Sequence, residues 1–300
     1  MHSERLRLIF QHVFNQISWT WSLPSEDFEI PKQAPLSPTN ILELAQRYFV
    51  QRSLLREKSS PSFFNEETFL KEIRGLFEFA SSKQSKILCC TDTNYPALLR
   101  HIPRFPLVLF AKGESRLNHR RLVSIVGSRK ATSEALEASY DLGFKLARRE
   151  FCIVSGGAFG CDAAAHQGAI DSGVAGSTIA VFASGLNQLY PRRLDCLFED
   201  ILLSGGSLVS ERLPSIKPLR HDFPIRNRII AGMADELHLM QAGEKSGAMI
   251  TANLALDYGR EVRVWNPCLD DVRFIGNARL LNRGAENSQS TEKTISWDAL

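Results

Sequence analysis

The sequence predicts an α/β protein with a doubly wound, mostly parallel sheet, preceded by a small helical domain. Apolar runs alternate with helix-forming stretches from residue 122 to about residue 285, which is typical of βαβ units. Two of these runs, FCIVSG and STIAVFA, are apolar without alternation, as expected for strands that helices cover on both faces. The chain of 300 residues is 44% hydrophobic and 23% charged, a composition typical of a globular protein with a sizeable core.

Residues 1–83 are expected to form the small helical domain. The apolar side chains between residues 6 and 17 fall on one helix face, and a proline-bearing connector follows them. Asn40, with Glu43 three positions later, is typical of a helix start, and Asn65 is expected to open a third helix. We interpret this domain as a packing or partner-contact module.

The sheet domain is expected over residues 84–285. Two apolar pieces, KILCCT and PLVLFA, are expected to pair as strands ahead of the regular alternation. The strands that follow are predicted at 122–127, 151–156, 177–183, 207–211, 236–241 and 261–265. The helices are predicted at 132–149, 161–172, 192–204, 224–233, 247–258 and 275–283. This order is Rossmann-like, and residues 286–300, which are mostly polar and carry Trp297 near the end, are expected to form a polar tail.

Several classes of protein are not supported by the composition. The net charge of +3 does not by itself indicate a nucleic-acid binder, so a basic site must come from local clustering. The six cysteines contain no CxxC pair, which argues against a zinc site and a disulfide framework. The motifs GxGxxG and GxxxxGK[ST] are absent, so no cofactor is expected. No secretory signal and no membrane span are expected, and we predict a cytoplasmic protein.

The turn Gly127-Ser128-Arg129-Lys130 follows the predicted strand 122–127 and precedes a helix. Ligands of such sheets bind beyond the carboxyl ends of the strands, and a helix N-terminus favours a phosphate. We predict that the N–H groups of Gly127 and Ser128 donate to one phosphate, with Arg129 closing over it. The alternative is a plain strand-to-helix turn with solvated charges.

The segment RLPSIKPLRHDFPIRNRII, residues 212–230, combines basic residues with an aromatic ring. Such a combination suits single-stranded nucleic acid, because the charges follow phosphates and a ring stacks on a base. Arg220 and Arg228 are expected to hold phosphates, and Phe223 is expected to stack on a base. A solvated loop with Phe223 packed in the core is an equal alternative. The basic residues here are Arg212, Lys217, Arg220, Arg226 and Arg228.

Three further turns follow predicted strands. Gly156 and Gly157 permit close approach of a ligand, while Asp162 and His166 share one helix face and suit either catalysis or, preferably, packing. The turn ASGLNQLYP, residues 183–191, suits a contact role or a simple connection equally. Lys245 and Ser246 precede a helix, as a phosphate contact or an ordinary cap. The residues predicted to bind nucleic acid are Gly127, Ser128, Arg129, Lys130, Gly156, Gly157, Arg220, Phe223, Arg226, Asn227, Arg228, Lys245 and Ser246.

Together, SIVGSRKAT, VSGGAFGCDAAAHQGA, TIAVFASGLNQLYP, LVSE, FPIRNRIIAGM, SGAMITANLAL and GREV resemble the DprA (Smf) family of DNA-processing proteins. The resemblance covers about residues 94–285. It implies an extended Rossmann-like fold that binds single-stranded DNA without known catalysis, protects incoming DNA in natural transformation and loads the RecA recombinase as a homodimer. The family pocket matches the turn at 127–129, the segment around Arg220, Phe223 and Asn227-Arg228, and the loop at Ser246.

The sequence departs from the family pattern in two motifs. Residues 157–162 replace the usual Leu-Ala-x-Gly-Ile-Asp, and residues 265–267 replace Val-Pro-Gly. No C-terminal winged helix is expected after residue 285. The alternative function is a nucleotide phosphoribohydrolase-like Rossmann enzyme, although its Pro-Gly-Gly-x-Gly-Thr-x-x-Glu motif is absent, and a third is an adaptor that no longer binds DNA. We therefore expect no enzyme activity and no bound metal.

Overall fold

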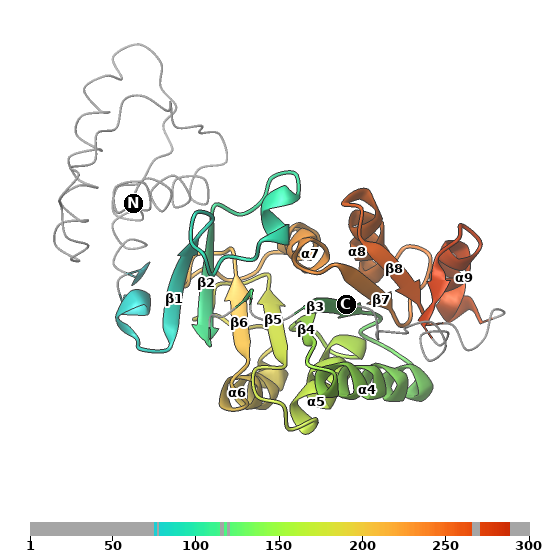
Figure 1. The fold of residues 1–300 in the computed structure, drawn as a ribbon, viewed down its shortest axis with the longest axis horizontal. Helices are drawn as coiled ribbons and strands as arrows, with labels where there is room; N and C mark the ends of the chain where they lie inside the picture. The colour runs from blue at the N-terminus through green and yellow to red at the C-terminus, as the bar shows by residue number, and fades with distance from the viewer. Residues whose placement is uncertain (1–74, 77, 115–116, 119–120, 266–270, 289–300) are drawn as a thin grey trace, which may run out of the picture.

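The computed structural model describes residues 75–76, 78–114, 117–118, 121–265 and 271–288, and Figure 1 shows their arrangement. Within this part, one nine-stranded sheet runs in the order β1-β2-β6-β5-β4-β3-β7-β8-β9. Its strands are β1 (Ser85–Cys89), β2 (Val108–Gly113), β3 (Leu122–Val126), β4 (Cys152–Gly156), β5 (Thr178–Phe182), β6 (Ser207–Ser210), β7 (Glu236–Leu239), β8 (Glu261–Val264) and β9 (Glu286–Asn287). The α-helices are α4 (Ser133–Arg148), α5 (Cys161–Asp171), α6 (Asp195–Leu203), α7 (Asp222–Met233), α8 (Gly247–Asp257) and α9 (Ile275–Leu281).

The strand pairing confirms a doubly wound, mostly parallel sheet. From β3 the chain builds β4, β5 and β6 on one side, and then crosses to build β7, β8 and β9 on the other. Strands β3 to β9 all pair in parallel, whereas β1 and β2 pair antiparallel with each other, and β2 is antiparallel to β6. The direction of winding therefore reverses between β3 and β7, where sheets of this type bind ligands.

Helices cover both faces of the sheet. In Figure 1, α4, α5 and α6 lie below it, while α7 and α8 lie above it. The alternation in β2 shows how one strand serves two cores, because Val108 and Phe110 join the core under α6, while Leu109 and Ala111 join the core under α7 and α8. Burial on both faces explains why the predicted strands read as continuous apolar runs.

Helices α4 and α5 pack against each other with almost no side chain between them at one point. A Cβ atom added to Gly143 would lie 2.4 Å from the Ala165 carbonyl oxygen. One added to Gly168 would lie 2.0 Å from the carbonyl oxygen of Tyr140. The two glycines therefore allow the two helix backbones to touch.

The two ends of the predicted sheet domain differ in detail from expectation. Residues 1–74 and 289–300, with Trp297, lie outside the described residues. Leu76 and Phe79 are buried, and the Phe79 ring packs edge-on against Phe110 of β2, so these two side chains pack in the core of the sheet. The polar tail was expected to begin at residue 286, whereas residues 286–287 form β9 beside β8.

Among the residues that the structure describes, no helix is long and apolar enough to cross a membrane.

Candidate nucleic-acid interface

The turns after β3 and β4 lie against each other at the carboxyl edge of the sheet. Gly127 follows β3 directly and Gly156 ends β4, as predicted. Gly160 has a φ of +81°, and a Cβ atom added there would lie 2.1 Å from the Ser128 carbonyl oxygen. The Cys161 N–H donates to that oxygen at 3.2 Å. Only glycine at position 160 therefore lets the second turn support the first.

An exposed cation and two aromatic rings meet above these turns. The Arg129 guanidinium carbon lies 4.9 Å from the centroid of the Phe223 ring, and Arg129 is exposed while Phe223 is half-buried. The Tyr190 ring packs edge-on against Phe223, with centroids 6.0 Å apart and ring planes at 70°. Three segments far apart in the sequence thus join here: the GSRK turn, the turn after β5 and the start of α7.

Tyr190 is a residue of this cluster that sequence reasoning did not single out. It lies in the turn ASGLNQLYP, for which contact and connection were equal alternatives, and 51% of its surface is exposed. The available signal was an aromatic residue in a turn at the carboxyl edge of a parallel strand. Sequence alone did not place this ring beside Phe223, because the two residues come from different βα units.

A buried carboxyl group and a buried guanidinium lie beneath the turns. Asp162 is 7% exposed and Arg226 is 6% exposed. Arg226 Nη1 donates to the Val181 carbonyl oxygen at 2.6 Å. A Cβ atom added to Gly156 would lie 2.2 Å from Arg226 Nη1 and 2.6 Å from Asp162 Oδ2. Gly156 therefore leaves the space in which the two charged groups approach each other.

This arrangement bears on one residue that was predicted to contact nucleic acid. Arg226 is only 6% exposed, so its guanidinium supports the turns from below instead of facing a ligand. Burial raises the pKa of Asp162 to about 7, while the Arg226 charge and the Gly127 N–H act in the opposite direction.

Two other predicted residues of the β4 turn have structural partners. His166 is buried, with Nδ1 2.6 Å from Thr178 Oγ1 and Nε2 3.3 Å from the Gly156 carbonyl oxygen. Burial lowers its pKa to about 4, so the ring is neutral near pH 7. Gly157 is also buried, and an added Cβ atom would lie 2.6 Å from the Phe182 ring. These contacts support the packing interpretation of His166.

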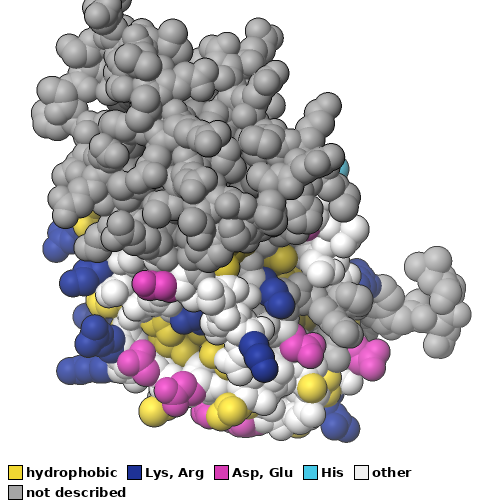
Figure 2. Space-filling view, turned by 90° about the vertical axis from the view of Figure 1, so that its left-hand side faces the viewer, with side chains coloured by type: hydrophobic (Ala, Val, Ile, Leu, Met, Phe, Trp, Pro, Cys, Tyr) yellow, Lys and Arg dark blue, Asp and Glu magenta, His cyan; other side chains and the backbone are white. Residues whose placement is uncertain are grey.

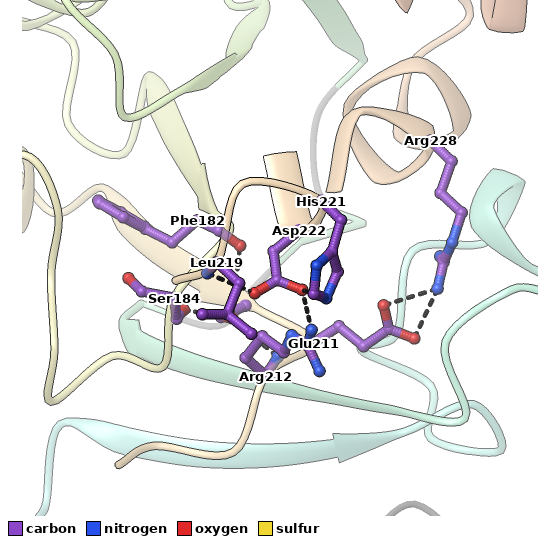
Figure 3. A network of polar contacts seen from close by, with 9 residues as sticks. Phe182, Ser184, Glu211, Arg212, Leu219, His221, Asp222 and Arg228 are labelled. Carbon is purple, nitrogen blue, oxygen red and sulfur yellow. Dashed lines mark hydrogen bonds and ion pairs between the residues drawn. The ribbon is translucent and has the colours of Figure 1, made fainter. Parts of the chain in front are cut away.

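The start of α7 is held by a network of polar contacts, shown in Figure 3. The Asp222 carboxylate accepts hydrogen bonds from the Arg212 guanidinium and, at 2.8 Å, from the Leu219 N–H. His221 Nε2 lies 3.4 Å from the same carboxylate. Because Asp222 is the first residue of α7, these contacts fix the position of Phe223, its neighbour along the chain.

Arg228 is bound to another side chain. Its Nη2 donates to both oxygens of Glu211 at 2.6 Å, as Figure 3 shows. The two side chains are 15% and 17% exposed, so the ion pair is largely shielded from water. Arg228 was predicted to bind a phosphate, and its guanidinium is instead paired with the carboxylate of Glu211.

Two polar residues that were predicted to bind nucleic acid contact the first turn of α8. Ser246 Oγ accepts from the Met249 N–H at 3.3 Å and caps α8, which agrees with the alternative of an ordinary cap. Asn227 Nδ2 donates to the Gly247 carbonyl oxygen at 3.3 Å and links α7 to α8. The predicted cations with exposed side chains are Arg129, Lys130, Arg220 and Lys245.

The stretch of chain that forms this interface is also the one that is similar to known proteins. A model of the family called DNA recombination-mediator protein A matches residues 86–297. The chain belongs to this family. DNA processing protein DprA of Bacillus subtilis (strain 168), a member of the DprA/Smf group that the sequence motifs resemble, is 38% identical over 203 residues, which are 67% of each chain.

Two solved structures of DNA recombination-mediator protein A relatives share the fold. DNA processing protein A from Streptococcus pneumoniae matches with a TM-score of 0.69 and 25% identity, over 98% of this chain and 96% of that one. DNA processing protein A from Helicobacter pylori, determined for its single-stranded DNA binding mode, matches with a TM-score of 0.63 and 28% identity, over 72% and 97%. The predicted family and fold class are confirmed.

Several curated members of the DNA recombination-mediator protein A family are longer than the segment that matches. This chain spans about half of the length of three of them, with 54%, 46% and 44% covered. Within the described part of the chain, no group of three His, Cys, Asp or Glu residues is placed to hold a metal ion. The side of the molecule that carries β1 shows basic and acidic side chains interspersed, so it is not a uniformly basic surface (Figure 2).

Proposed function

We propose that this DNA-processing family member binds single-stranded DNA at the carboxyl edge of the sheet. The observation that carries the proposal is the exposed Arg129 guanidinium, which lies 4.9 Å from the Phe223 ring centroid beside the point where the sheet winding reverses. A cation next to an aromatic ring offers one group for a phosphate and one for a base. The Helicobacter pylori relative was determined for its single-stranded DNA binding mode, which supports the same ligand.

The proposed contacts with the DNA backbone come from exposed cations. Arg129 and Lys130 lie in the turn after β3, Arg220 precedes α7, and Lys245 precedes α8, all at the carboxyl edge. Ser128 supplies the backbone of the turn, and Phe223 stacks on a base. Arg226 and Arg228 act from behind by holding the turns and the start of α7, because their guanidinium groups already have partners in the protein.

Replacing Arg129 with alanine is expected to weaken single-strand binding for every DNA sequence and to flatten its salt dependence. Each phosphate contact contributes about 0.7 to the slope of log affinity against log salt for single strands, so the loss of one contact should reduce the slope by about that amount. Fluorescence anisotropy with a labelled oligonucleotide, from about 50 to about 200 mM salt, measures both quantities.

The matched control is Arg148→Ala. Arg148 is exposed in the last turn of α4, at the end of the helix that lies away from the carboxyl edge. Its replacement should therefore change neither the affinity nor the salt slope. Phe223→Ala should weaken binding about 5- to 150-fold while leaving the salt slope nearly unchanged, since stacking releases no counterions. If a folded Arg129→Ala protein keeps the affinity and the slope of the parent, the proposed phosphate site is wrong.

We also propose, on family resemblance, that the protein works as a homodimer and hands its DNA to the RecA recombinase. Light scattering at micromolar concentration should give twice the chain mass of 33.6 kDa. A co-sedimentation assay should then show more RecA on single strands when this protein is present than when it is absent. A monomer at all concentrations would contradict the dimer.

The proposed function includes no catalysis. Two carboxylates near the start of α7 already have protein partners: Asp222 accepts from Arg212 and the Leu219 N–H, and Glu211 pairs with Arg228. A free nucleophile or general base is not needed to bind and protect DNA. The expected absence of nucleotide hydrolysis remains a prediction.

A further inference from the structure

The ring of Tyr190 is open to a ligand although its loop is firmly held. Half of the residue, 51%, is exposed. The turn that carries it is hydrogen-bonded to the segment leading to α7, through the Gly185 N–H to the Ile216 carbonyl at 2.8 Å and the Asn187 N–H to the Pro214 carbonyl at 2.9 Å. An exposed aromatic side chain on a fixed loop loses little conformational freedom when it binds a ligand.

Glycine makes this attachment of the loop possible. A Cβ atom added to Gly185 would lie 2.0 Å from the Leu213 carbonyl oxygen and 2.4 Å from that of Pro214. The two backbones therefore touch, and the loop of Tyr190 is positioned by the same segment that precedes Phe223. The relative orientation of the two rings is set by the protein before any ligand arrives.

That orientation has a consequence for what can bind. The two ring planes meet at 70°, with centroids 6.0 Å apart. A base stacked on either ring lies parallel to it, so two bases stacked on the two rings are turned steeply against each other. Successive bases of a duplex strand lie nearly parallel, at a rise of about 3.4 Å. Only a strand whose bases are unpaired can present two bases in this way.

We propose that Tyr190 is a second stacking residue of the single-strand site, which holds the base next to the one on Phe223 and so selects unpaired strands. The inference rests on the proposed function, since it concerns the same site. The Arg129 guanidinium lies over the Phe223 ring. In this proposal it holds a phosphate next to the two bases. The crossed rings thus add a shape requirement to the attraction of the cations, which by themselves also attract duplex DNA.

The test compares Tyr190→Ala with the parent protein on three ligands: a thymidine oligonucleotide of about 16 nucleotides, an abasic strand of the same length, and a duplex. Tyr190→Ala should weaken binding of the thymidine strand about 5- to 150-fold, leave binding of the abasic strand unchanged and reduce the preference for single strands over duplex. Tyr190→Phe keeps the ring and should behave as the parent. Phe144→Ala removes a partly exposed ring from α4 and serves as the control.

The outcomes separate the two proposals. If the parent binds thymidine strands and Tyr190→Ala binds them equally well, the second stacking role is wrong while the proposed function stands. If Tyr190→Ala loses affinity equally for thymidine and abasic strands, the ring supports the loop instead of a base, and the inference is again overturned. If the parent binds none of the ligands, the proposed function fails as well.

Discussion

A Gly160→Ala variant is expected to lose about 2–6 kcal/mol of unfolding free energy and, in the fraction that folds, most of its affinity for single strands. A non-glycine residue in a backbone conformation that favours glycine costs about 1–3 kcal/mol, and overpacking costs about 1–3 kcal/mol more. Both apply here, since φ is +81° with ψ at −132°, and the new Cβ atom would lie 2.1 Å from the Ser128 oxygen. Relief of the collision must move the backbone of Ser128 and Arg129, the turn proposed to meet the phosphate.

Gly173→Ala is the matched control for this substitution. Gly173 has a similar φ of +72°, but no atom lies within 4 Å of an added Cβ. Its alanine variant should therefore show only the conformational cost of about 1–2 kcal/mol and normal DNA binding. Urea denaturation followed by circular dichroism measures the stability, and anisotropy measures the affinity. Equal losses in the two variants would contradict the contact between the turns.

The second large effect is expected from Arg226→Leu. The substitution removes the charged donor to the Val181 carbonyl, and the loss of a hydrogen bond from a charged group costs about 1.5–3 kcal/mol. It also removes the positive charge near the buried Asp162 carboxyl. Because Arg226 is buried, the loss should appear first in stability, with DNA binding weakened through displacement of the turns. Urea denaturation at two pH values measures the loss of unfolding free energy.

The pH dependence of this loss has a definite sign. Burial raises the pKa of Asp162 from its usual 3.8 to about 7. Between about pH 4 and pH 7 the folded protein thus holds a proton that the unfolded chain has released, so the contribution of Asp162 to stability falls as pH rises through this window. The Arg226 charge lowers that pKa, and its removal raises the pKa further, so the deficit of Arg226→Leu should be larger at about pH 8.5 than at about pH 5.5.

A double variant isolates the carboxyl group. In Arg226→Leu with Asp162→Asn, no buried carboxylate remains, so the extra loss at high pH should disappear. A deficit in Arg226→Leu that is equal at both pH values would show that Asp162 does not sense the guanidinium.

Most of the fold could be predicted because strands buried on both faces carry a strong apolar signal. The predicted strand at 151–156 is observed as Cys152–Gly156, and that at 122–127 as Leu122–Val126, so the glycine turns were placed correctly. The last strand was missed since it has only two residues, too few for any periodicity. The pairing of β2 with β6 was also not predictable, because the sequence of neither strand indicates which strand it pairs with.

The candidate site was predictable in position but not in detail. Position follows from the rule that turns after parallel strands share one edge, which brings Arg129 near Phe223. Which arginines face solvent depends on contacts between distant segments: Glu211 occupies Arg228, and the space beside Gly156 receives Arg226. A basic run in the sequence does not distinguish a cation that meets a ligand from one that holds the framework.

The direct backbone contact of α4 and α5 has a consequence for how the site moves. Each helix begins just after one of the two touching turns, at Ser133 and Cys161, and the helices meet again at Gly143 and Gly168. Opening one helix to solvent would expose the buried surface of the other, so their amide hydrogens should exchange with deuterium in one cooperative step. DNA bound at the turns would then slow exchange along both helices, far beyond the residues that it touches.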